Sequence, residues 1–154
     1  MYTETYQNLH RQEKALEVLE ILLTEEFAEL RERKPESITG IEFSIHELMR
    51  QIANERTDLK ASLGGQRLAD VLQMLAEEEQ AELTALLGRI DVLEKRCSRQ
   101  ASMNAELALA LHDQSQALLN HLQSQIQPRN NATYGRTGAY TQSRPEAVLI
   151  HGRL

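Results

Sequence analysis

The residues of this chain best suited to catalysis or metal binding are five histidines and a single cysteine. His46 opens the stretch "HELMR", which begins like a zinc-protease motif, but the residue four positions on is Arg50 instead of a second histidine. His112 and His121 stand nine residues apart, which does not place them on one helix face. No glutamate stands three residues before a histidine, so the pairing used by helical di-iron sites is absent. The histidines therefore predict surface or capping roles and no metal site.

The other residues with reactive potential also have structural interpretations. Cys97 falls within an apolar row, which predicts a buried small hydrophobe, and as the only cysteine it cannot form an internal disulfide. Gly64 and Gly65 lack the neighbouring Lys and Ser or Thr of a phosphate-binding loop. The acidic run Glu77–Glu79 suits a solvated helix start, where the helix dipole favours negative charge. We therefore expect no enzymatic activity and no cofactor.

Charge is unevenly distributed along the chain. Residues 1–126 carry 13 basic and 22 acidic groups, and residues 127–154 carry 4 basic groups and 1 acidic group. The acidic body argues against a nucleic-acid partner and against a helix lying on a membrane surface. No stretch approaches the roughly 20 apolar residues that a membrane span needs, and the first residues do not resemble a secretory signal. These features predict a cytoplasmic protein with no stable membrane insertion.

Leucine and isoleucine spacing predicts an all-α fold. Leucines spaced by seven predict a first amphipathic helix from about Thr3 to Arg33, ended by Pro35. A second helix is expected to begin between Ser37 and Ser44 and to end at Gly64-Gly65. Two capping boxes compete for its start, Thr39 with Glu42 and Ser44 with Glu47, and the pattern does not decide between them.

A third helical pattern runs from about Glu78 to Gln127, with Pro128 closing it. A short amphipathic stretch near Leu68 to Leu75 precedes it, and the "AEEEQAEL" that follows this stretch is either a kink or the charged first turns of the third helix. After Pro128 the chain becomes rich in glycine and polar residues and loses its period. The predicted architecture is an antiparallel bundle or coiled coil of three main helices with one very long C-terminal helix. The predicted domains are a helical body, 1–127, and a flexible tail, 128–154.

The third helix is too long to be covered by the other two. Fifty residues of helix extend about 75 Å, whereas the first two helices reach about 45 and 35 Å. Part of its apolar row must therefore stay exposed, bend back, dimerise or meet a partner. Its last part, "QSQALLNHLQSQIQP", contains no Asp, Glu, Lys or Arg, as is typical of interface centres. The alternative is that this row belongs to an ordinary bundle core.

The order of these elements resembles the FlgN family of flagellar type III export chaperones. The resemblance is closest from Ala105 to Thr141, where a long helix with Asn, Gln and Leu is followed by a proline-containing break and then "TYGRTG". The stretch "ERTDLKASL", from Glu55 to Leu63, is similar to the second helix of the family. The end "SRPEAVLIHGRL" matches no pattern of the family, and the join "ESITGIEFSIHELM" is more apolar than a helical hairpin needs.

The resemblance implies a chaperone that holds the C-terminal helical segments of hook–filament junction proteins and delivers them to the export gate. It implies that Tyr134, with Gly135 beside it, contacts the gate component FlhA, which would explain an aromatic residue in a polar tail. It also implies a cargo surface on the third helix, formed by Met103, Leu107, Leu111, Leu118 and Leu122.

Two other classes of protein remain alternatives. A structural coiled-coil or scaffold protein would homo-oligomerise through the same leucine rows and would have no need of Tyr134. A helical enzyme or metal protein would need ligand spacings that are missing from the sequence. The sequence leaves open a homodimer of the chaperone itself.

Overall fold

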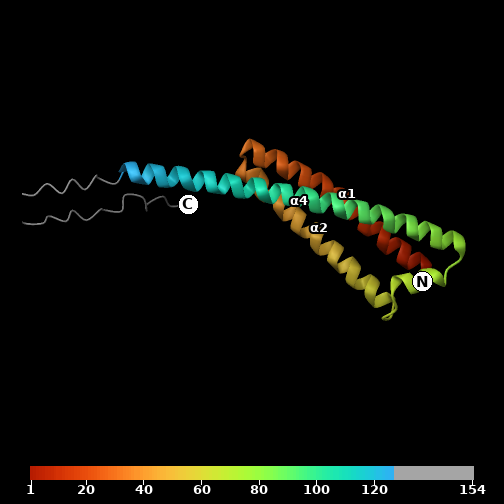
Figure 1. The fold of residues 1–154 in the computed structure, drawn as a ribbon. Helices are drawn as coiled ribbons and strands as arrows, with labels where there is room; N and C mark the ends of the chain where they lie inside the picture. The colour runs from red at the N-terminus through yellow and green to blue at the C-terminus, as the bar shows by residue number, and fades with distance from the viewer. Residues whose placement is uncertain (127–154) are drawn as a thin grey trace, which may run out of the picture. The chain divides into compact units, whose positions relative to one another are not determined.

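The computed structural model describes residues 1–126, and this part of the chain is helical without any strand. Figure 1 shows its four helices, α1 (Tyr2–Glu32), α2 (Pro35–Ser62), α3 (Leu68–Gln73) and α4 (Glu77–Ile126). The predicted all-α fold with a very long last helix is confirmed. The chain divides into two compact units, Met1–Ala110 and Leu111–Leu154, and of the second the structure describes Leu111–Ile126. The tail predicted for 128–154 lies outside the described residues.

Helix α1 follows the predicted bounds to within one residue, and its seven-spaced leucines form the buried face. Leu9, Leu16, Leu23 and Leu30 are each less than a tenth exposed. The helix ends at Arg33, whose φ of 57° is left-handed. This conformation lets the backbone N–H groups of Arg33 and Lys34 donate to carbonyls of the last helical turn. The chain can then reverse within two residues.

The predicted start of the second helix was wrong. Helix α2 begins at Pro35, since a proline in the first turn removes only an N–H that has no partner there and supplies a helical φ. Neither capping box is used, and Lys34 stands at the N-cap without a side-chain cap bond. The hydroxyl groups of Thr39 and Ser44 instead donate to the carbonyls of Pro35 and Gly40, one turn back inside the helix.

The end of α2 and the short amphipathic segment after it lie where the sequence predicted them. Gly64 and Gly65 adopt positive φ values of 58° and 88° and end the helix, as predicted. The amphipathic stretch that follows is a separate short helix, α3, which places Val71 in the core at 1% exposure. Helix α4 begins at Glu77, so the acidic run of "AEEEQAEL" forms the charged first turn of the last helix.

Helix α4 lies beside α1 in the first unit and runs in the same direction (Figure 1). Contacts between the two helices repeat every seven residues. Arg89 pairs with Glu13 at 2.5 Å and Arg96 pairs with Glu20 at 2.7 Å. The Sγ of Cys97 donates to the carbonyl of Leu16 at 3.6 Å, and one heptad later Asn104 Nδ2 donates to the carbonyl of Leu23 at 2.8 Å.

Helix α2 returns along α1 and is joined to it by polar contacts as well as by the core. Glu55 accepts hydrogen bonds from Arg11 and from Asn8, whose amide nitrogen lies 2.8 Å from its carboxylate. The buried hydrophobic cluster draws on all three long helices. Its members are Leu9, Ala15, Leu16, Leu19, Leu23, Ile45, Ile52, Leu83, Leu86, Ile90 and Cys97.

Candidate functional site

The apolar row of α4 is fully covered in the first part of the helix. Leu83 and Leu86 have no exposed surface, and Ile90 and Cys97 are 6% and 5% exposed. Charged residues such as Arg89 and Arg96 flank the row and pair with glutamates of α1. This part of α4 is therefore ordinary helix-bundle core, and it holds α4 in register with α1.

The sequence analysis placed Met103 in the buried apolar row of this helix. In the structure, the neighbouring Asn104 is buried there instead. Its side chain is 4% exposed, whereas Met103 is 43% exposed. Its amide nitrogen donates to the Leu23 carbonyl and to the Glu26 carboxylate, so the buried amide is satisfied. Asn104 stands seven residues after Cys97, and this heptad spacing could have identified Asn104 as a core position from the sequence. A buried asparagine in a repeating seam typically fixes register.

The five residues predicted to bind cargo all lie on α4, in two different compact units. Met103 and Leu107 belong to the first unit and Leu111, Leu118 and Leu122 to the second. Leu107 and Leu111 are half-buried, while Leu118 is 59% and Leu122 46% exposed. The predicted docking residues, Tyr134 and Gly135, lie outside the described residues.

The last part of α4 presents an exposed apolar row without charged neighbours. Leu118, Leu122 and Ile126 follow one another in steps of four, and Leu119 beside them is 52% exposed. From Gln114 to Ile126 the sequence contains no Asp, Glu, Lys or Arg. The alternative that these residues belong to a buried bundle core is wrong for Leu118, Leu122 and Ile126. Exposed apolar residues without charged neighbours are the composition typical of the centre of a protein interface.

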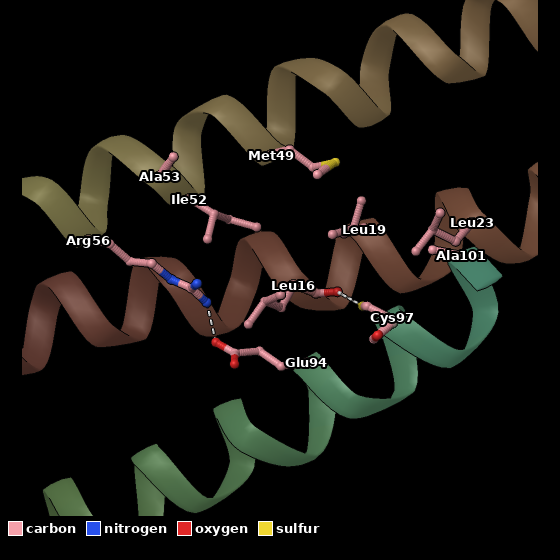
Figure 2. A pocket seen from close by; sticks show the side chains of 11 residues that line it. Leu16, Leu19, Leu23, Met49, Ile52, Ala53, Arg56, Glu94, Cys97 and Ala101 are labelled. Carbon is pink, nitrogen blue, oxygen red and sulfur yellow. Dashed lines mark hydrogen bonds and ion pairs between the residues drawn. The ribbon is translucent and has the colours of Figure 1, made fainter. Parts of the chain in front are cut away.

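A second apolar surface lies within the first unit, where a groove of about 650 Å³ runs between α2 and α4. Figure 2 shows Leu16, Leu19 and Leu23 of α1 at its floor, with side chains of α2 and α4 as its walls. Residues of the walls include Met49, Ile52, Ala53, Cys97, Ser98 and Ala101. The Arg56–Glu94 ion pair closes one end. Sequence reasoning did not find this groove, because it arises from the separation of α2 and α4, which both pack on α1.

Two carboxylates at the α1 interfaces, Glu13 and Glu55, have pKa values lowered by arginines of neighbouring helices. The Arg89 guanidinium, with a smaller contribution from His10, lowers the pKa of the Glu13 carboxyl from its usual range. The Arg11 guanidinium lowers the pKa of the Glu55 carboxyl. Each glutamate bonds residues of a neighbouring helix or turn, so we assign both a structural role.

The chemistry of Cys97 matches the interpretation as a buried small hydrophobe. Its side chain is 5% exposed, and burial raises the pKa of the thiol, which disfavours the thiolate needed by a nucleophile. In the part of the chain that the structure describes, no three His, Cys, Asp or Glu residues gather as metal ligands would. Within residues 1–126, no helix combines the length and the apolarity of a membrane span.

These observations first define a class: an all-helical protein whose long last helix exposes an apolar row without charged neighbours. A family model described as "FlgN protein" matches residues 1–142, nearly the whole chain. The chain therefore belongs to the FlgN family, which is a family of flagellar export chaperones. Neither the comparison with curated proteins nor that with solved structures found a match.

Proposed function

We propose that this protein is a cytosolic export chaperone that binds the C-terminal helical segments of hook–filament junction proteins and delivers them to the export gate. One observation carries the proposal most strongly, the exposed and charge-free apolar row of α4 at Leu118, Leu122 and Ile126. A cargo helix laid along this row would bury its own apolar face, which would otherwise promote aggregation. Burial of about 800 Å² on each partner is enough for a specific and reversible complex.

The decisive experiment is calorimetric titration of the full chain with C-terminal peptides of the two junction proteins. We expect saturable one-to-one binding that is lost in the double variant Leu118→Asp/Leu122→Asp, since two carboxylates would then be buried without partners. The matched control is Val18→Asp/Ile21→Asp, which alters two exposed apolar residues of α1 instead, and it should bind normally. If neither peptide binds the folded wild-type chain, the proposed cargo is wrong.

Delivery to the gate is proposed to depend on Tyr134 beside Gly135, as the resemblance of "TYGRTG" to the family implies. An aromatic ring in a polar segment can serve as an anchor in a partner's pocket. Tyr134→Ala should abolish binding to the cytosolic domain of FlhA while leaving cargo binding unchanged. Tyr140→Ala removes the other tyrosine of the same region and provides the matched control.

The scaffold alternative would require homo-oligomerisation through the leucine rows. The α1 row of Leu9, Leu16, Leu23 and Leu30 is already buried within the chain, so it offers no surface to a second copy. An oligomer would have to form through another surface, such as the exposed row of α4. Measurement of the molar mass by light scattering, with and without cargo peptide, distinguishes a scaffold from a chaperone whose dimer gives way to cargo.

A further inference from the structure

The segment 143–154 carries a feature that neither the fold nor the proposed function uses. The family model matches residues 1–142, so this segment lies beyond the part of the chain that it covers. Its sequence is "SRPEAVLIHGRL", and "AVLI" at 147–150 is the longest run of apolar residues after Ile126. The segment lies outside the residues that the structure describes. Four consecutive apolar side chains in a polar stretch are stabilised by leaving water, and an apolar surface to pack on would allow this.

The described apolar surface closest to this run in the sequence is the exposed row at the end of α4. Leu118, Leu122 and Ile126 are 59%, 46% and 57% exposed. Together with Leu119 beside them, they form a continuous apolar strip. The strip spans eight residues of helix, which is about 12 Å. Four residues of extended chain span about 10–13 Å, so the run and the strip match in length.

The length of the intervening chain allows the run to reach every residue of the strip. Residues 127–146 join Ile126 to the run, and a chain of this length spans up to about 65 Å. Both segments belong to the second unit, Leu111–Leu154, so their contact requires no particular placement of the first unit. A tethered segment meets its site at an effective concentration in the millimolar range, which favours it over a second copy at micromolar concentration.

The sequence around the run favours an extended conformation. Val148 and Ile150 are β-branched, as is typical of strands. Pro145 and Gly152, which stand on either side of the run, are the two poorest residue types for a helix interior. An extended segment needs hydrogen-bond partners for its own backbone N–H and C=O groups. A face that receives it must therefore offer polar groups beside its apolar residues.

Amide side chains border the strip on both sides and can supply these partners. Gln125 stands three residues after Leu122, and its amide nitrogen bonds the His121 ring at 3.0 Å. The amide oxygen of Gln125 can accept from a backbone N–H of the run. Gln123, four residues after Leu119, borders the other side with both a donor and an acceptor. The strip and its borders thus suit a short extended segment.

We propose that residues 147–150 pack along Leu118, Leu122 and Ile126 and shield this row until cargo displaces them. The contact itself depends only on the chain, whereas its consequence for cargo rests on the proposed function. A shield of four residues is weak as a free peptide and acts through its tether, so it lowers the affinity for cargo without preventing binding. It also limits association of the exposed row with a second copy while no cargo is bound.

Tryptophan fluorescence provides a local probe of the contact without any cargo. The chain contains no tryptophan, so Leu119→Trp introduces a single reporter at the edge of the row. Val148→Asp/Ile150→Asp breaks the proposed contact, because burial of two carboxylates on an apolar strip is costly. We expect this double variant to move the emission to longer wavelength, as the indole becomes exposed to water. Ala132→Asp/Ala139→Asp adds the same charge elsewhere in the tail and should leave the emission unchanged.

A second reporter tests whether the effect is local to the row. Val92 lies on α4 in the first unit and is 52% exposed. Val92→Trp therefore places an exposed indole on the same helix away from the proposed contact. Its emission should respond neither to Val148→Asp/Ile150→Asp nor to the control pair.

Calorimetry with the C-terminal peptides of the junction proteins measures the consequence for cargo. The full chain without added tryptophan is used, with its tail intact. Val148→Asp/Ile150→Asp should bind cargo about fivefold more tightly than the wild type, because the row is then free at all times. Ala132→Asp/Ala139→Asp should bind as the wild type does.

Three results would overturn the proposal. Unchanged emission from Leu119→Trp in the Val148→Asp/Ile150→Asp background would show that the run does not cover the row. A dependence of that emission on protein concentration would identify a second copy as the occupant. Equal cargo affinity of the wild type and the double variant would show that no shield opposes binding. If neither peptide binds at all, the proposed function fails, and the tryptophan emission still determines whether the contact exists.

Discussion

Two parts of the same helix, α4, carry the same kind of apolar row and differ in what covers it. Leu86 has no exposed surface, whereas Leu118 is 59% exposed, although both are leucines at helical spacing in one unbroken helix. The period of a row identifies which residues share a face, but it does not reveal whether another element packs there. The neighbours of the row are more informative. Around Leu86 they are charged and form ion pairs, and around Leu118 they are Gln, Asn and Ser.

This difference follows from how a helix seam is specified. In the covered part, ion pairs such as Glu13 with Arg89 lie at the edge of the seam and favour one register between α1 and α4. A surface meant for a transient partner gains from lacking such charges, because each would lose its water when the partner binds. The presence or absence of charge beside the row therefore distinguishes the covered part of α4 from its exposed part better than the row itself does.

The difference between the covered and the exposed part of α4 is tested most directly by truncating one leucine in each part. Leu86→Ala should lower the free energy of unfolding by about 3 kcal/mol, since it removes a fully buried side chain and leaves a cavity. Leu118→Ala should change it by less than about 0.5 kcal/mol, as exposed substitutions do. Urea unfolding followed by circular dichroism measures both. Comparable losses in the two variants would mean that Leu118 is covered in solution.

A second pair of substitutions tests the buried asparagine that ends the covered seam. Asn104→Ala should cost about 1–3 kcal/mol, because the Leu23 carbonyl and the Glu26 carboxylate both lose a donor. Asn120→Ala, in the exposed part of the same helix, should be close to neutral, since Asn120 accepts only a long hydrogen bond of 3.5 Å from Gln116. Chemical denaturation of the two variants side by side gives the comparison. Equal stability would show that Asn104 is not a structural lock.

The sequence predicted the positions of the helices well, but it predicted only in part which helix faces are buried by other helices. Seven-spaced leucines located α1 and its buried face, because a long row of leucines at helical spacing indicates the buried face of an amphipathic helix. Paired glycines located the end of α2, but Pro35 was assigned only the role of ending α1, although it also begins α2.

The groove and Asn104 escaped prediction for another reason. The groove depends on the distance between helices that are remote in sequence, which no local pattern encodes, and Asn104, although it stands seven residues after Cys97, was passed over because it is polar. Met103 was placed in the row since methionine is apolar, whereas the tertiary contact with Leu23 and Glu26 places Asn104 there instead.

A third prediction uses pH, because ionised interhelical pairs belong to the covered part of the molecule. Glu13 and Glu55 have folded-state pKa values below the usual 4.5, so the unfolded chain binds protons first as the pH falls. Their stabilisation is fully present above that value and is lost as the pH falls through the folded-state values. Glu13→Gln/Glu55→Gln should therefore lose about 1–2 kcal/mol at neutral pH, since the arginine partners are half-exposed.

The same double variant should show a shallower decline of stability in acid than the wild-type chain does. Glu106→Gln is the matched control, because Glu106 is an exposed glutamate of α4 with no recorded ion pair, and its acid profile should match the wild type. Thermal melts across the acidic range provide the measurement. If the stability of the double variant falls with pH as steeply as that of the wild type, these two carboxylates do not cause the loss of stability in acid.

The smallest expected effect concerns the one glycine of α4, Gly88, which lies in the covered part of the helix. A Cβ built at Gly88 meets no atom within 4 Å, so Gly88→Ala should add helix propensity without disturbing the packing on α1. We expect a gain of about 0.5–1 kcal/mol in the free energy of unfolding.

Gly64→Ala is the informative control, because Gly64 also has open space around it but has a φ of 58°. There an alanine should cost about 1 kcal/mol through backbone strain. Opposite signs for two glycines with equal room would show that backbone conformation decides at Gly64 and helix propensity at Gly88. A loss at Gly88 would instead mean that α1 approaches α4 more closely in solution than the structure shows.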